Sequence, residues 1–172
     1  MALAEDLLEQ ARHLANRERR RPKQASLRRA VSAAYYALFH LLAREAGRLV
    51  VPGSLPADLR HLVVRAHNHG EMKRAAKGWI TGVGALPREL QSVVPSFPEG
   101  LNDVAASFVA LQELRHEADY NTAATFGREE VLRAVERAER AFDRRNAIRK
   151  NPVAATFLLS LLFGGRFIRR SN

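Results

Sequence analysis

One short stretch, residues 114–122, reads "LRHEADYNT" and gathers several groups that could do chemistry. Arg115 offers a permanent cation, while His116 and Tyr120 offer groups that donate or transfer a proton. Together these groups could bind an anion and donate hydrogen bonds to it.

The spacing within this stretch limits the chemistry. Tyrosine ordinarily ionises near pH 10 and histidine near pH 6.5, so Tyr120 is better suited to donate a hydrogen bond to a phosphate that Arg115 grips. On a helix His116 points about 100° away from Arg115. A structural alternative stays open, in which Arg115 pairs with Asp119 at i,i+4, Tyr120 packs against the next helix, and His116 is exposed.

Apolar periodicity shows which elements must position these residues. Spacings of three to four predict a first helix over about 3–14, a central second helix over about 26–46, and a weaker third helix from about 56. We expect residues 80–98 to form a loop with one helical turn. The fourth helix is predicted over about 99–120, and the fifth helix begins near 128. We expect an all-α bundle of about five helices plus a C-terminal apolar helix.

Length and composition predict one globular domain. The chain has 172 residues, of which 47% are hydrophobic and 27% charged. We expect a bundle over residues 1–150 and an apolar, basic segment over 151–172 that packs on the bundle or on a partner. Its run "VAATFLLSLLFGG" has 13 residues, fewer than the roughly 20 that span a bilayer. With an acidic N-terminus and no cysteine, this predicts a cytoplasmic protein and disfavours a membrane role.

The formal net charge of +10 favours nucleic acid, an anionic membrane or an acidic protein as a partner. The clearest cluster of basic residues lies between and within the first two helices. Those predicted to contact a nucleic-acid backbone are Arg19, Arg20, Arg21, Lys23, Arg28 and Arg29. Such contacts give an affinity that falls steeply with salt, and the alternative is a solvated loop.

Two stretches resemble known helices. "SLRRAVSAAYYALFHLL", residues 26–42, and "LQELRHEADY", residues 111–120, are similar to two helices of HEPN domains, named for higher eukaryotes and prokaryotes nucleotide-binding. The resemblance implies a small up-and-down helical bundle, commonly a homodimer. Many members are metal-independent ribonucleases, and such cleavage needs a group that takes the 2'-hydroxyl proton, a group that protonates the leaving oxygen, and a cation that stabilises the phosphorane. Some members are toxins neutralised by a nucleotidyltransferase-like antitoxin.

The resemblance also assigns positions. Arg115 matches the family's arginine and His116 its polar position, whereas Tyr120 stands where active members carry histidine. Residues expected to support this site are His40, Asp119 and Tyr36. The resemblance implies no cofactor. It leaves open whether the chain is an enzyme, in which His116 or His40 would have to transfer the proton, or a degenerate interaction module.

A metal site is not predicted. His61, His67 and His69 lie near Glu71, but their spacing fits neither a helical His-x-x-x-His pair nor a zinc finger.

Overall fold

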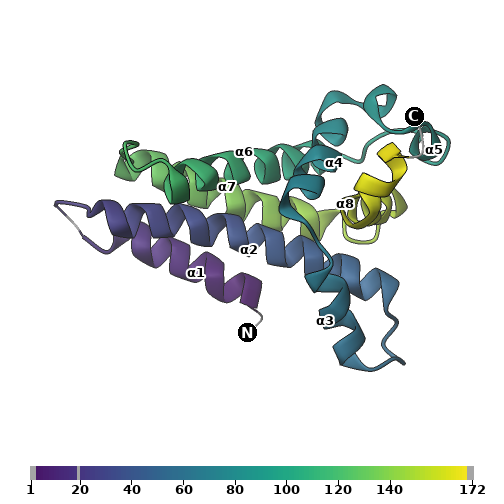
Figure 1. Cartoon of the computed structure of the whole chain (residues 1–172), viewed down its shortest axis with the longest axis horizontal. Helices are drawn as coiled ribbons and strands as arrows, with labels where there is room; N and C mark the ends of the chain where they lie inside the picture. Colours follow the sequence, from purple (N-terminus) through teal and green to yellow (C-terminus); the bar gives the residue numbers. More distant parts are fainter. Residues whose placement is uncertain (1–2, 19, 170–172) are drawn as a thin grey trace. The chain divides into compact units, whose positions relative to one another are not determined.

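The computed structural model describes residues 3–18 and 20–169, with side chains described up to Phe163 in the last helix. All regular structure in this part of the chain is helical, as predicted (Figure 1). The helices are α1 (Leu3–Asn16), α2 (Gln24–Val50), α3 (Ala57–Arg65), α4 (His69–Thr81), η1 (Val83–Ala85), α5 (Arg88–Gln91), α6 (Leu101–Tyr120), α7 (Arg128–Ala147) and α8 (Pro152–Arg169).

The boundaries differ from the prediction mainly in the middle of the chain. The expected third helix is two helices, because the Asn68 side chain accepts hydrogen bonds from the backbone N–H groups of Gly70 and Glu71, at 2.9 and 3.1 Å, and begins α4. The loop predicted over 80–98 contains η1 and α5. α2 also continues to Val50, about one turn beyond the predicted end.

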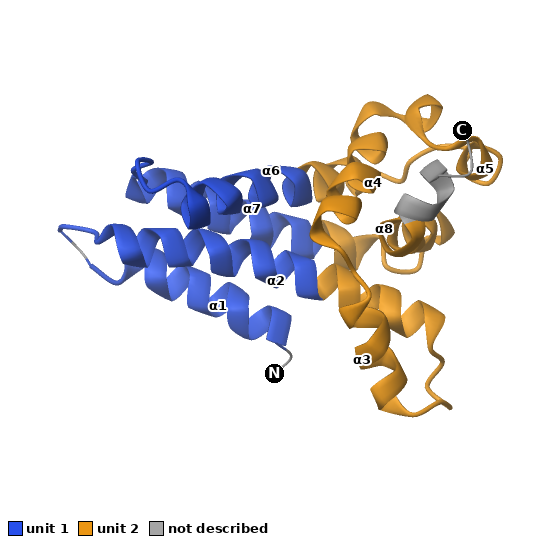
Figure 2. Ribbon diagram, viewed as in Figure 1, with its two compact units in different colours: residues 1–40, 107–143 blue, residues 41–106, 144–172 orange. Residues whose placement is uncertain are grey.

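The chain forms two compact units (Figure 2). Unit 1 comprises residues 1–40 and 107–143, and unit 2 comprises residues 41–106 and 144–172. The boundaries fall inside α2, α6 and α7, so each of these helices contributes to both units. The expected C-terminal segment, 151–172, belongs to unit 2 and does not form a unit of its own.

In unit 1, α2 is the most deeply buried helix, which confirms its predicted central position. Between Ala30 and Phe39 every residue except Tyr36 is buried. The rings of Tyr35 on α2 and Phe108 on α6 lie 5.7 Å apart between their centroids, which is the usual range for packed aromatic pairs. Tyr36 is thus the one polar ring that this stretch of α2 keeps within reach of solvent.

Two side chains of α2 hold the segment that follows α6. The Gln24 amide donates to the carbonyl of Phe126 and accepts from its N–H group, at 2.9 and 2.8 Å. The Arg28 guanidinium donates to four backbone carbonyl groups, those of Ala118, Asn121, Thr122 and Ala124. A cation is favourable at a helix C-terminus, where carbonyl groups lack helical partners. Arg28 therefore fixes the end of α6.

In unit 2, α8 packs against α4. Trp79 is buried on α4, its ring lies 5.4 Å from that of Phe157, and its indole N–H donates to Ser160 Oγ at 2.9 Å. The described part of α8 is therefore docked within the chain. Among the described residues, no helix has the length and apolar character needed to cross a membrane.

A buried ion pair also lies in unit 2. Arg145 Nη2 on α7 is 2.7 Å from Glu45 Oε2 on α2, and the two side chains are only 3% and 7% exposed. Burial lowers the pKa of Arg145, and the Glu45 carboxylate opposes this effect. Arg145, in the last turn of α7, therefore cannot contact a surface ligand.

Candidate functional site

Arg115, in the last two turns of α6, is held by groups from two helices. Its Nη2 donates to the hydroxyl of Tyr36 on α2 at 2.9 Å, and its Nε lies 2.6 Å from Asp119 Oδ2 in an ion pair. Its Cζ lies 5.3 Å from the ring centroid of Tyr36 and 5.4 Å from that of Tyr120. These contacts hold the guanidinium in one orientation beside two aromatic rings.

Asp119 connects this arginine to a second residue of α2. Its Oδ1 accepts a hydrogen bond from Ser32 Oγ at 2.6 Å, while Oδ2 pairs with Arg115. Burial by itself would lower the pKa of Arg115, but Tyr36, Asp119 and Tyr120 raise it. The guanidinium is therefore a permanent cation, partly neutralised by its carboxylate neighbour.

The three residues predicted as catalytic lie together. The ring of Tyr120 lies 5.0 Å from that of His116, on the same helix, and the Arg115 guanidinium lies over it. His116 is exposed and Arg115 is paired with Asp119, as in the structural alternative. The expectation that Tyr120 packs against the next helix is wrong, because 65% of this residue is exposed. Its phenol is open to a ligand.

His40 lies one turn along α2 from Tyr36. Its ring centroid is 6.3 Å from that of Tyr36 and 5.2 Å from that of Phe39. Burial lowers the pKa of His40 below its ordinary value of 6.5, because the charged imidazolium loses hydration. His40 is therefore mainly neutral at pH 7 and can accept a proton, and its described link to Arg115 runs through Tyr36.

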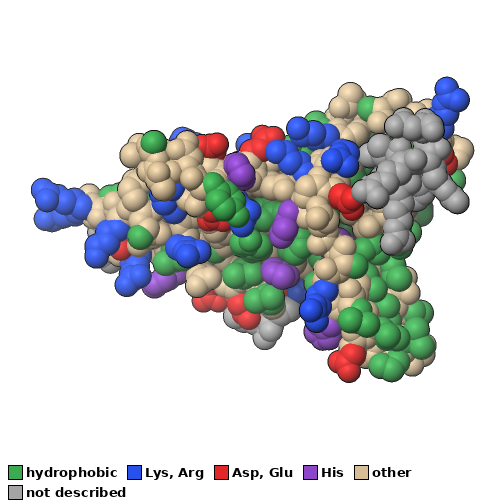
Figure 3. All heavy atoms as spheres, in the orientation of Figure 1, with side chains coloured by type: hydrophobic (Ala, Val, Ile, Leu, Met, Phe, Trp, Pro, Cys, Tyr) green, Lys and Arg blue, Asp and Glu red, His purple; other side chains and the backbone are tan. Residues whose placement is uncertain are grey.

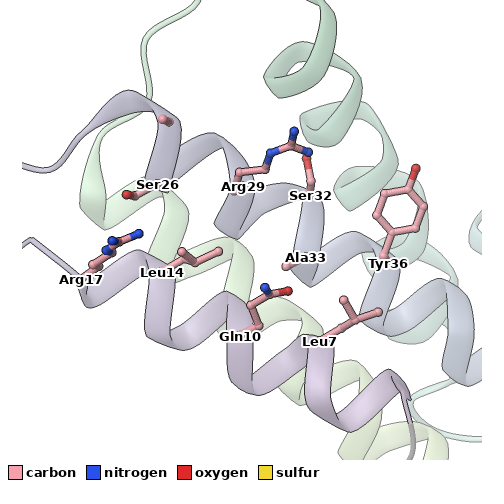
Figure 4. A pocket seen from close by; sticks show the side chains of 10 residues that line it. Leu7, Gln10, Leu14, Arg17, Ser26, Arg29, Ser32, Ala33 and Tyr36 are labelled. Carbon is pink, nitrogen blue, oxygen red and sulfur yellow. The ribbon is translucent and has the colours of Figure 1, made fainter.

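A groove of about 490 Å³ runs between α1 and α2 (Figure 4). Both helices contribute apolar and polar side chains to its lining, which consists of Leu7, Gln10, Leu14, Arg17, Ala25, Ser26, Arg29, Ser32, Ala33 and Tyr36. Ser32 and Tyr36 are the residues that hydrogen-bond Asp119 and Arg115. The groove thus adjoins the cluster around Arg115. The available sequence signal was a polar face of α2 at Arg29, Ser32 and Tyr36, spaced i, i+3 and i+7.

A second cavity of about 580 Å³ lies between the start of α2 and the end of α6. Arg29 and Asp119 both contribute to its lining. Arg29 also lines the first groove. This exposed cation is therefore within reach of a ligand in either cavity of unit 1.

The residues predicted to contact nucleic acid do not form one surface with equal roles. Arg20, Arg21 and Lys23 are exposed around the connector between α1 and α2, and Arg19 lies outside the described residues. Arg28 is engaged with carbonyl groups and its Cζ lies 5.5 Å from the ring centroid of Phe126, which gives it a structural role. Of the described members, Arg29 lines both cavities next to the Arg115 cluster, and Arg28 lines the second one.

His61 on α3, His69 on α4 and His67 between these helices form no metal site, since no three His, Asp or Glu side chains converge among the described residues. His67 is buried, with Nδ1 3.0 Å from the carbonyl oxygen of Val63.

The fold and the site together define an all-helical protein whose candidate site is an arginine held between residues of two helices. Comparison of the chain with protein-family models, with curated proteins and with solved structures found no match in any of the three. The resemblance to HEPN domains thus stays a prediction, carried by the stretches 26–42 and 111–120.

Proposed function

We propose that the Arg115 cluster binds a phosphate group of RNA or of a nucleotide. The observation that carries this proposal is the fixed guanidinium of Arg115 beside the exposed phenol of Tyr120 and the exposed ring of His116. An arginine that neighbouring groups already orient loses little entropy when it binds an oxyanion. A phenol and an imidazole next to it supply further hydrogen-bond donors.

The contact between the two stretches that resemble HEPN helices, residues 26–42 and 111–120, supports the interpretation of this site as HEPN-like. Tyr36, in "AYYALFH" of α2, accepts a hydrogen bond from Arg115, in "RHEADY" of α6. Ser32 and Asp119 join the same two stretches a short distance away. In our proposal these helices form an RNA-phosphate site of HEPN type, and a homodimer would bring two copies of it.

Cleavage is a further step of the same proposal. Arg115 would stabilise the charge of the phosphorane that forms when the 2'-oxygen attacks the phosphorus. His116 or His40 would take the proton of the 2'-hydroxyl and return it to the leaving oxygen, because both are imidazoles near the Tyr120–Arg115–Tyr36 group. Such a metal-independent ribonuclease would suit a toxin that a nucleotidyltransferase-like protein neutralises.

Replacing Arg115 with Ala tests the site. We expect the affinity for a short RNA or a mononucleotide to fall about tenfold or more, as for loss of a hydrogen-bonding charged group. Arg115→Lys should recover only part of it, because lysine keeps the charge but lacks the planar guanidinium. The measurement is fluorescence anisotropy with labelled RNA, together with a hydrolysis assay on mixed RNA.

Arg12→Ala is the matched control for this experiment. Arg12 is an exposed arginine of the same unit, paired with Glu139 at 2.6 Å, and its removal should change RNA affinity little. Equal affinities and equal cleavage for wild type, Arg115→Ala and Arg12→Ala, with circular dichroism showing all three folded, would reject the phosphate site.

A different observation favours a second candidate function, that of a helical protein-interaction module. Five of the nine exposed large hydrophobic residues among those described lie within residues 49–62: Leu49, Val50, Leu55, Leu59 and Leu62. α3 buries none of its residues. Figure 3 shows hydrophobic side chains gathered over α3 and the end of α2. Such concentration of apolar surface is typical of a protein contact.

Leu59→Lys combined with Leu62→Lys tests this second function. If a nucleotidyltransferase-like protein encoded by a neighbouring reading frame binds this surface, the double variant should no longer co-purify with it, because two charges would be buried without partners. Arg115→Ala should still co-purify. Unchanged co-purification of the double variant would show that residues 49–62 do not form the contact.

A further inference from the structure

The positive charge of the chain is concentrated in one of its two units. Unit 1 contains 13 Lys and Arg against 12 Asp and Glu, a formal net charge of +1. Unit 2 contains 15 Lys and Arg against 6 Asp and Glu, a formal net charge of +9. Residues 144–172 alone contribute seven Lys and Arg and no acidic residue. The field that attracts a polyanion therefore originates mainly in unit 2.

In unit 1 many cations already have partners. Arg12 pairs with Glu139 at 2.6 Å, Arg115 pairs with Asp119 at 2.6 Å, and Arg28 donates to carbonyl groups. On α7, Arg133 and Arg140 each lie within 3.8 Å of a glutamate one turn earlier. This mixed-sign surface favours a long polyphosphate chain much less than unit 2 does.

The surface of unit 2 with the most regular cationic pattern is α4. Its buried residues Met72, Ala76 and Trp79 share one face, and α8 packs against this helix. Of the basic residues on the other faces, Arg74 and Lys77 are exposed and Lys73 is half-buried. Lys and Arg side chains gather in Figure 3 over the region where Figure 1 shows α4. Like charges at i,i+4 weaken a helix, so this spacing has a cost that a ligand would offset.

We infer that Lys73, Arg74 and Lys77 form a contact surface for the phosphate backbone of single-stranded RNA. This inference rests on the proposed function, because it assigns the same class of ligand to a second surface, within unit 2. Lysine and arginine on a polar helix face contact phosphates without reading bases. The buried residues of α4 are Met72, Ala76 and Trp79, and this helix packs against α8, so its main apolar face is not available to a lipid surface. RNA, the polyanion of the proposed function, is therefore the ligand assigned to its cationic side chains.

The test replaces all three residues with glutamine, which keeps good helix propensity. The probe is a labelled single-stranded RNA of mixed sequence, and its affinity is measured by fluorescence anisotropy over a series of KCl concentrations. We expect the affinity to fall about tenfold or more at low salt, and the slope of log affinity against log salt to become shallower by about 2, as for loss of three phosphate contacts. Circular dichroism verifies that the variant is folded.

The matched control carries glutamine at Arg133, Arg137 and Arg140, three exposed arginines of α7. It removes the same net charge and should change the slope by much less than the α4 variant. Equal losses for the two triple variants would overturn the inference, because net charge alone would then explain the binding. A larger loss on replacing Arg20, Arg21 and Lys23 would also overturn it, in favour of the connector after α1.

The same assay separates this inference from the proposed function. If Arg115→Ala loses affinity while the α4 variant behaves as the α7 control, the phosphate site stands and the α4 surface is rejected. If the α4 variant loses affinity and Arg115→Ala does not, the α4 surface stands and the Arg115 site falls. Wild-type protein that floats with phosphatidylglycerol vesicles and does not retain RNA would overturn both.

Discussion

Replacing Tyr120 with histidine is expected to raise the rate of RNA cleavage by about 100-fold, at the lower end of what a positioned general acid or base contributes. A phenol ordinarily ionises near pH 10 and an imidazole near pH 6.5, so only the imidazole exchanges protons readily at neutral pH. Position 120 faces the Arg115 guanidinium and the His116 ring, and the residue is 65% exposed. The change should therefore leave the fold intact. The measurement is hydrolysis of a labelled RNA as a function of pH.

Two further variants make this result specific. Tyr120→Phe removes the hydroxyl without adding a titrating group, and it should not increase the rate. Adding Arg115→Ala to Tyr120→His should abolish the gain, because the cation that stabilises the phosphorane would be missing. No gain for Tyr120→His at any pH near neutrality, despite RNA binding, would show that the cluster lacks the geometry for cleavage.

Replacing Glu45 with Ala is expected to lower the free energy of unfolding by about 3–5 kcal/mol, because removal of one partner leaves a buried charge without compensation. The Arg145 side chain is 3% exposed, and its Nε and Nη1 have no hydrogen-bond partner among the described residues. Such a loss is a large part of the 5–15 kcal/mol typical of a folded protein. Chemical denaturation followed by circular dichroism measures it.

The control for this prediction is an exposed ion pair. Glu139→Ala breaks the pair with Arg12, whose side chain is 60% exposed, and should cost at most about 1 kcal/mol. Combining Glu45→Leu with Arg145→Met should recover most of the stability, since no buried charge remains. If Glu45→Ala costs no more than Glu139→Ala, the buried pair does not contribute as its burial implies.

The predicted site depends on residues whose roles are structural. Arg28 was expected to contact nucleic acid, but its guanidinium binds the carbonyl groups at the end of α6. The side-chain amide of Gln24 donates to the carbonyl of Phe126 and accepts from its N–H group. Together, Arg28 and Gln24 hold the turn that follows Tyr120. The position of the Arg115 cluster against α2 therefore relies on side chains that a charge count would assign to the surface.

Local features of this protein could be predicted from the sequence. The spacing of apolar residues indicated the helices and the central burial of α2, because one face of an amphipathic helix must leave water. Helical geometry also offered the Arg115–Asp119 pair and the exposure of His116 as one of the alternatives for this stretch, because i and i+4 lie on one face and i+1 lies about 100° away. The start of α4 could not be predicted from the spacing of apolar residues, because its signal is a single side chain, the Asn68 cap.

The tertiary structure alone decided which distant residues meet. Tyr36 and Arg115 are 79 residues apart, and Ser32 and Asp119 are 87 apart, yet each pair is hydrogen-bonded. The same holds for the buried pair of Glu45 with Arg145, and for the distribution of charge as +1 and +9 between the units. The spacing of apolar residues predicts that a helix has a buried face, but it does not predict which other helix packs against that face. Partners across that face arise only from packing, which depends on the shape of every side chain in the core.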